Sequence, residues 1–171
     1  DTNAPTVILS DNISSNYING SETLRIISTF NEAMSSSPKI SISGQVSNLS
    51  MTSSTTSVWY YDWNVPDSFN GVVTATVTGT DLAGNSYSGT HSITYVIDNT
   101  LPTVLLSDTN SDNMITNSNQ VTITATFSEP MTVTPTISIS NVITNAVMTA
   151  TSSASVWIYP WVVSTTYNGV V

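Results

Sequence analysis

The chain has 171 residues, of which only 8% are charged, and its 11 acidic and 2 basic residues give a formal net charge of −9. Ordinary soluble proteins carry roughly 25% charged residues, so Ser, Thr and Asn provide most of the polar surface in this chain. The negative charge argues against nucleic acid or an anionic membrane as partner. The absence of cysteine excludes disulfides and thiolate metal sites. No apolar run approaches the roughly 18 residues of a membrane span.

The sequence contains two copies of one repeat. The segment that begins at Asp1 recurs at Asp98, an offset of 97 residues, and the match includes Thr-Phe-x-Glu-x-Met at 29–34 and again at 126–131. One inserted residue raises the offset to 98 before the Trp-x-x-x-Trp pairs. Tandem copies supply length and multivalency, and copies of this size predict two small domains, 1–98 and 99–171.

Short alternating segments rich in Val, Ile, Thr, Tyr and Trp, separated by Asn, Asp, Gly and Pro turns, predict strands in both repeats. In the first repeat we expect seven strands, at 6–9, 24–30, 39–43, 49–52, 58–64, 72–79 and 86–97. In the second repeat we expect counterparts of the first six, at 103–106, 121–127, 136–140, 147–151, 156–162 and from 170 onward. This strand count in about 97 residues is typical of an all-β, immunoglobulin-like β-sandwich.

We expect the second sandwich to lack its last strands. Val171 corresponds to Val73, so counterparts of most of the sixth strand and of the whole seventh strand are missing. A sandwich without its last strand exposes a sheet edge and part of its core. Three explanations stay open: a cut array, a remainder that a structure does not resolve, and a strand supplied by another chain.

Two side-chain stripes each allow a structural and a binding interpretation. Trp59, Tyr61 and Trp63 share one face of a strand, as do their counterparts at 157, 159 and 161. We interpret this stripe as packed core, with a sugar-stacking platform as the alternative. The threonines at 74, 76, 78 and 80 are interpreted as an outward face with high β propensity, with ice or polysaccharide binding as the alternative.

The few acidic residues are predicted to gather at one pole of the sandwich. In an immunoglobulin-like topology, the start of the first strand, the loop after the second and the loop after the sixth share that pole. The candidate ligands are Asp1, Glu32, Asp81 and Asn85 in the first repeat, and Asp98, Asn99 and Glu129 at the junction. Close carboxylates repel one another unless a cation joins them, and Ca²⁺ prefers such oxygen ligands. We therefore predict Ca²⁺ sites; the alternative is that these residues only form turns and strand ends.

A second possible source of ligands lies at the opposite pole, at Asp11, Asn12 and Asp67. Catalytic signatures are weak by comparison. His91 is the only histidine, and the sequence has no cysteine nucleophile, no glycine-rich phosphate loop and no histidine pair for zinc. Paired carboxylates at a pole could mimic a glycosidase pair, but no substrate cleft is predicted around them. We therefore expect that the chain is not an enzyme.

Six motifs occur in a fixed order along the repeat. They are Asp-x-x-x-Pro-Thr-Val-x-Leu-Ser-Asp, Thr-Phe-x-Glu-x-Met, Ile-Ser-Ile-Ser, Trp-x-x-x-Trp, Gly-Thr-Asp-Leu-Ala-Gly-Asn-x-Tyr-Ser-Gly-Thr and Ile-Asp-Asn-Thr. Together they resemble the bacterial immunoglobulin-like (Big-type) repeats that occur in tandem in very large secreted surface adhesins. The resemblance covers 1–98 and what is present of 99–171; it departs at the missing last strand and at Pro130, which replaces Ala33.

This resemblance implies an extracellular, cell-surface stalk that is often stiffened by Ca²⁺ between repeats. Glu32, Asp81, Asp98 and Glu129 match its motif positions. The expected function is therefore a structural spacer of an adhesin, with neighbouring repeats of the same protein as partners. The alternatives are a carbohydrate- or ice-binding module, and an extracellular filament subunit completed by a strand from another copy. Neither nucleic-acid binding nor membrane insertion is expected.

Overall fold

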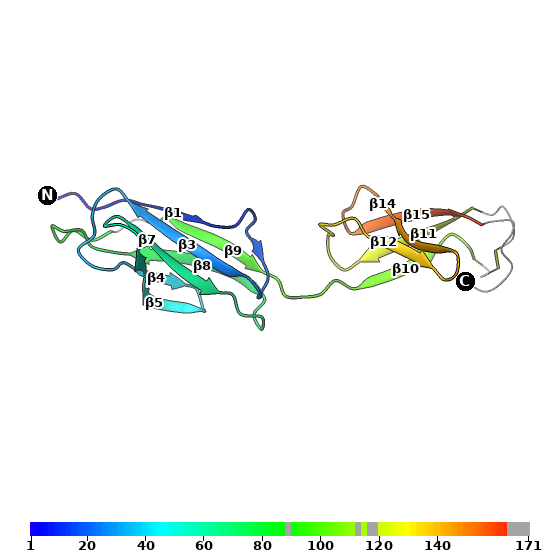
Figure 1. Cartoon of the computed structure of the whole chain (residues 1–171), viewed down its shortest axis with the longest axis horizontal. Coiled ribbons are helices and arrows are strands. Elements are labelled where there is room, and N and C mark those ends of the chain that lie inside the picture. The colour runs from blue at the N-terminus through cyan, green and yellow to red at the C-terminus, as the bar shows by residue number, and fades with distance from the viewer. Residues whose placement is uncertain (88–89, 112–113, 116–119, 164–171) are drawn as a thin grey trace. The chain divides into compact units, whose positions relative to one another are not determined.

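The computed structural model describes residues 1–87, 90–111, 114–115 and 120–163. Within these residues the secondary structure consists of β-strands, and no helix is long and apolar enough to span a membrane. The chain separates into two compact units, Asp1–Thr100 and Leu101–Val171, so the division falls two residues after the expected boundary (Figure 1). The all-β fold expected from the sequence is therefore confirmed.

Unit 1 is a sandwich of two sheets. The first has the order β1-β3-β7-β6 and consists of Val7–Asp11, Thr23–Phe30, Val58–Asn64 and Thr52–Ser53. The second has the order β2-β9-β8-β4-β5 and consists of Tyr17–Ile18, Ser92–Ile97, Gly71–Thr78, Lys39–Ile42 and Val46–Ser50. β2 runs parallel to β9, and the neighbouring pair β8–β9 is antiparallel. This strand order is that of an immunoglobulin-like sandwich.

Alternation of apolar and polar residues explains which face of each strand is buried. In β8, Val73, Ala75 and Val77 are buried, whereas Thr76 and Thr78 between and after them are exposed. Successive side chains of a strand point to opposite faces, so this pattern places one face of the sheet in the core. The threonine stripe therefore lies on the face of β8 opposite the core.

The aromatic stripes belong to the cores, as interpreted from the sequence. Trp63 retains 5% of its surface exposed, Trp157 8% and Trp161 6%. Trp59 and Tyr61 are half-buried and pack against the core of unit 1. Large aromatic side chains contribute heavily to core energetics, so the stripe stabilises the sandwich.

Two strand predictions for unit 1 need correction, and one short strand was not predicted. The expected strand at 49–52 is divided at Met51, whose buried side chain and hydrogen bond to the carbonyl of Pro38 mark the passage from one sheet to the other. The expected strand at 86–97 begins only at Ser92; Ser86 forms an isolated bridge with Thr80, and residues 88–89 lie outside the described part. β2 was not predicted, because a two-residue strand carries no periodic signal.

Unit 2 repeats the first sheet of unit 1. Its order is β10-β11-β15-β14, formed by Val104–Asp108, Gln120–Phe127, Val156–Val162 and Thr149–Ala150. The register is equivalent, because Val104 pairs with Phe127 as Val7 pairs with Phe30. In the described residues its second sheet contains two strands, β12 (Thr136–Ile139) and β13 (Ile143–Val147). The strand expected from 170 onward lies outside the described part.

Candidate metal centre

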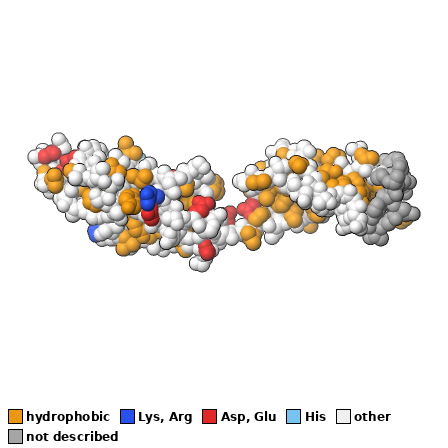
Figure 2. Space-filling model, viewed as in Figure 1, with side chains coloured by type: hydrophobic (Ala, Val, Ile, Leu, Met, Phe, Trp, Pro, Cys, Tyr) orange, Lys and Arg blue, Asp and Glu red, His pale blue; other side chains and the backbone are white. Residues whose placement is uncertain are grey.

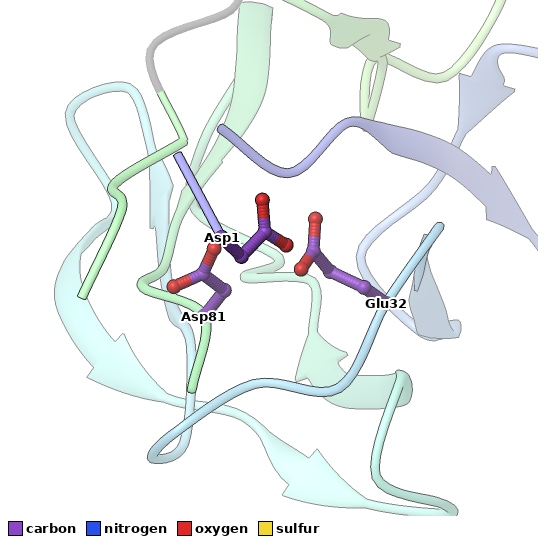
Figure 3. A group of neighbouring side chains, drawn as sticks. All are labelled: Asp1, Glu32 and Asp81. Carbon is purple, nitrogen blue, oxygen red and sulfur yellow. The ribbon is translucent and has the colours of Figure 1, made fainter. Parts of the chain in front are cut away.

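Asp1, Glu32 and Asp81 come together at one pole of unit 1 (Figure 3). Each offers one carboxylate oxygen, and these oxygens lie within 4.8 Å of one another. Asp1 precedes β1, Glu32 follows β3 and Asp81 follows β8. Among the described residues this is the one group of three or more acidic, histidine or cysteine side chains that lie close enough to share a metal ion.

Backbone pairing explains why these three loops converge. Asn31 donates its N–H to the carbonyl of Thr6 at 3.1 Å, and its Oδ1 accepts the N–H of Thr6 at 2.7 Å. These two bonds place Glu32 beside the segment that leads into β1. On the other side, Asp81 forms a bridge with Met34, so the loop after β8 is attached to the loop after β3.

Asp81 is a fully buried carboxylate within a tight loop. Its Oδ1 accepts the N–H groups of Ala83 and Asn85, each at 2.8 Å, and its Oδ2 accepts Nδ2 of Asn85, also at 2.8 Å. Gly84 has φ +94°, a conformation that glycine adopts without strain, and this allows the loop to turn back on Asp81. The Asp and Asn of this loop therefore also have the turn-forming role that the alternative interpretation assigned to them.

The pKa of the Asp81 carboxyl is lowered from its ordinary value of 3.8. The main cause is the hydrogen bond from the Asn85 side chain, and burial opposes it. The backbone N–H groups of Asn85, Ala83 and Gly84 lower the pKa further. A buried carboxylate that accepts several N–H bonds stays ionised, so Asp81 contributes a fixed negative charge to the pole.

Asn85 positions Asp81 in this structure. Its Nδ2 donates to Oδ2 of Asp81 and lies 3.5 Å from the carbonyl oxygen of Asp1. A nitrogen donor does not bind a cation, so only the Oδ1 of Asn85 has the chemistry of a ligand. The sequence correctly placed Asn85 in this cluster of residues, and its observed contacts are those of an orienting side chain.

No basic side chain compensates the pole. The sequence has two basic residues, Arg25 and Lys39. Arg25 forms an ion pair with Asp62 at 2.6 Å, and Lys39 donates to the hydroxyl of Ser50. Figure 2 shows acidic side chains at the end of unit 1 that holds the N-terminal segment; one basic group lies near that end but apart from them, and the other lies farther along the unit. The mutual repulsion of the three carboxylates is therefore available to drive cation binding.

The three predicted junction ligands are divided between the two units. Asp98 accepts the N–H of Thr100 on Oδ1 at 3.0 Å, which forms a local turn. Glu129 belongs to unit 2, and its Oε1 is buried without a hydrogen-bond partner among the described residues. Since Asp98 and Asn99 belong to unit 1, the junction site stays a prediction.

Asn99 has a structural role that sequence reasoning missed. Its Oδ1 accepts the N–H of Gly20 at 2.6 Å, and its Nδ2 donates to the carbonyls of Phe69 at 2.7 Å and Pro66 at 3.3 Å. The side chain therefore joins two loops to the end of β9. These partners lie 30 to 79 residues away, so no local sequence signal could have found them.

The opposite pole is held by hydrogen bonds rather than by a cluster of free carboxylates. Asp11 accepts the N–H of Ile13 on Oδ1 at 3.0 Å and the hydroxyl of the buried Tyr95 on Oδ2 at 3.0 Å. Asn12 accepts the N–H of Arg25 at 2.8 Å. Burial and the neighbouring Asp11 charge raise the pKa of Tyr95, which stays protonated as the donor. His91, which precedes β9, is exposed, and its backbone N–H donates to the hydroxyl of Tyr87 at 3.0 Å.

The fold and the pole define a class: an immunoglobulin-like β-sandwich with acidic oxygen donors at one end. A scan against protein-family models and a search of curated proteins found no match to this chain.

Proposed function

We propose that this chain is a pair of structural spacer modules of an extracellular bacterial surface protein, similar to Big-type adhesin repeats, with a Ca²⁺ site at the acidic pole. The observation that carries the proposal is the convergence of Asp1, Glu32 and Asp81 without a basic side chain to neutralise them. A cation is the simplest partner for such a group, because bringing like charges together is otherwise unfavourable.

An all-oxygen donor set with several carboxylates has the ligand chemistry that Ca²⁺ takes. Ca²⁺ takes six to eight oxygen ligands at about 2.3–2.6 Å, so oxygens across its coordination sphere lie about 5 Å apart. The oxygens of the cluster lie within 4.8 Å of one another, which agrees with that spacing. Three carboxylates, each able to bind through one or two oxygens, supply the core of the shell, and water or backbone carbonyls complete it.

Glu129 supports a similar role in unit 2. It is the counterpart of Glu32, and its Oε1 is buried without a hydrogen-bond partner among the described residues. A buried carboxylate oxygen without a partner is costly unless a cation, a proton or water satisfies it. This favours a cation at the start of the second unit too, which is where the resemblance to Big-type repeats places one.

The path of the chain through unit 1 supports a spacer. Asp1 lies at one pole, and the chain leaves β9 at the opposite pole, where Asn99 is fixed to Gly20 and Phe69 (Figure 1). A module with its entry and exit at opposite poles adds its full length to an array. Burial of Trp63, Trp157 and Trp161 removes the exposed platform that carbohydrate stacking requires, and this favours the spacer over that alternative.

Thermal unfolding in Ca²⁺ and in EDTA tests the proposal. Ligand that binds only the folded state stabilises it by about 2.7 kcal/mol at 100 times Kd. For a domain of this size that corresponds to an increase in Tm of roughly 10 °C or more. We expect the unfolding transition of unit 1 to shift upward in Ca²⁺. An unchanged Tm across millimolar Ca²⁺ would refute the calcium part of the proposal.

A further inference from the structure

A pair of parallel strands connects the beginning of unit 1 directly to its end. β2 runs parallel to β9, with Ile18 opposite Ile97, and both side chains are buried in the core. The pairing extends to either side of these residues. The N–H of Val96 donates to the carbonyl of Asn16 at 2.8 Å, and the N–H of Asp98 donates to the carbonyl of Ile18 at 3.0 Å.

Asn99 extends this connection beyond the end of β9. Its Oδ1 accepts the N–H of Gly20 at 2.6 Å, so a side chain continues the series of bonds that the backbone forms at residues 16 and 18. A Cβ at Gly20 would lie 2.4 Å from Cα of Asp67, so glycine allows this close approach. The N–H of Asn99 donates to Oδ1 of Asn70 at 2.6 Å, and its Nδ2 donates to the carbonyl of Phe69 at 2.7 Å. The end of β9 is therefore fixed to two separate loops.

These bonds lie in the direct path of a tension applied along the chain. Asp1 lies at one pole of unit 1, and β9 points toward the opposite pole, where the chain leaves the unit (Figure 1). Tension would pull β2 toward the entry, through β1, and would pull β9 toward the exit. The two strands are thus loaded along their own axes in opposite directions. Whether β1 or β9 detaches first from the rest of the unit, the bonds between β2 and β9 have to break.

We propose that β2, β9 and Asn99 form a mechanical clamp that resists unfolding of unit 1 under tension. Shear along the strands loads the bonds at residues 16, 18 and 20 at the same time, so they fail together. Peeling the same strands apart from one end breaks the bonds one after another, which requires less force. This clamp gives the spacer part of the proposed function a load-bearing role, and it does not depend on Ca²⁺, because Asp1, Glu32 and Asp81 are not members of it.

Single-molecule force spectroscopy on the full chain in EDTA tests the clamp. The chain has no cysteine, so pairs of attachment points can be introduced cleanly. Thr2→Cys with Thr100→Cys loads β2 and β9 in shear, whereas Ser21→Cys with Thr100→Cys peels them apart from one end; all three positions are exposed. We expect a clearly higher unfolding force in shear. Each shear event should lengthen the tether by roughly 300 Å, since an extended chain spans about 3.3–3.6 Å per residue.

Asn99→Ala tests the side chain within the clamp. At constant force in the shear geometry, losing the bond to Gly20 should raise the unfolding rate about tenfold, which corresponds to about 1.4 kcal/mol. In the peeling geometry this bond opens first, so the rate should change little. Ser43→Ala is the matched control, because it removes a similar bond of 2.9 Å from the N–H of Thr74, between β4 and β8. The control should change the shear rate much less than Asn99→Ala.

An ordinary stabilising role for Asn99 would give a different result, because its loss would then speed unfolding equally in both pulling directions. That outcome, equal unfolding forces in the two geometries, or an effect of Asn99→Ala no larger than that of Ser43→Ala would each overturn the proposal. The comparison of the two geometries needs no Asn99 variant, so it remains decisive if Asn99→Ala does not fold. Because all measurements are made in EDTA, failure of the clamp is distinguishable from failure of the calcium site.

Discussion

Asn85 donates its side-chain Nδ2 to Oδ2 of Asp81 at 2.8 Å, and this bond holds a fully buried carboxylate at the acidic pole of unit 1. It also lowers the pKa of the Asp81 carboxyl from its ordinary value of 3.8. The same loop that Asp81 stabilises therefore presents a permanent negative charge beside Asp1 and Glu32.

Asp81 should make unit 1 sensitive to acid. The pKa of Asp81 is lower in the folded state than in the unfolded chain. Its contribution to the stability of the folded state is therefore present above about pH 3.8 and is lost as pH falls through the folded pKa. Asp81→Asn should reduce stability at pH 7, and the difference from the original chain should shrink toward pH 2. Urea unfolding across this pH range measures the difference in free energy of unfolding, with the exposed Glu22→Gln as control. A difference that stays constant at all pH values would contradict a lowered pKa of Asp81 in the folded state.

The hydrogen bond from Tyr95 to Asp11 should contribute measurably to the stability of unit 1. Tyr95→Phe keeps the buried ring but removes a donor to a carboxylate, and bonds to charged groups are worth about 1.5–3 kcal/mol. The pKa of Tyr95 is raised above its ordinary value of 10.0 in the folded state. Its contribution to the stability of the folded state is therefore fully present below pH 10 and is lost as pH rises further. Chemical denaturation of Tyr95→Phe against Tyr17→Phe, whose side chain is exposed, checks this, and equal stabilities would contradict it.

Asn99 should stabilise unit 1 whether or not Ca²⁺ is present. Asn99→Ala leaves the N–H of Gly20 and the carbonyl of Phe69 without this partner, a loss of about 1–3 kcal/mol where the groups stay buried. Denaturation in Ca²⁺ and in EDTA separates the two roles. An equal loss in both buffers is the expected outcome; a loss seen only in Ca²⁺ would make Asn99 a metal ligand, as the sequence prediction had it.

Gly20 and Gly79 should respond differently to alanine. A Cβ at Gly20 would lie 2.4 Å from Cα of Asp67, and backbone cannot move aside cheaply. A Cβ at Gly79 would meet Cε of Met34 at 2.7 Å, the end of a flexible side chain. Gly20→Ala should therefore lower the Tm of unit 1 by more than Gly79→Ala. The reverse order in differential scanning fluorimetry would contradict the packing described around these two glycines.

The sequence predicted the strands that alternating residues mark and the loops that the repeated sandwich brings together. The strands at 58–64 and 156–162 were placed at their observed bounds, since alternating aromatic residues give a clear period. Asp1, Glu32, Asp81 and Asn85 were brought together because the sandwich topology fixes which loops share a pole. What was missed has no local signal: the parallel pair β2–β9, the sheet change at Met51, and the Asn99 side chain bonded to Gly20.

The most direct test of the account is calorimetric titration of Ca²⁺ into the EDTA-treated full chain, with Glu32→Gln and the exposed Glu22→Gln compared in parallel. If the pole binds Ca²⁺, Glu22→Gln should bind like the original chain, and Glu32→Gln should bind at least tenfold more weakly, which corresponds to about 1.4 kcal/mol. Without Ca²⁺, Glu32→Gln should be no less stable than the original chain, because it removes one of three repelling charges. Equal Ca²⁺ affinity of the two variants, or no binding to the original chain, would contradict the proposed site.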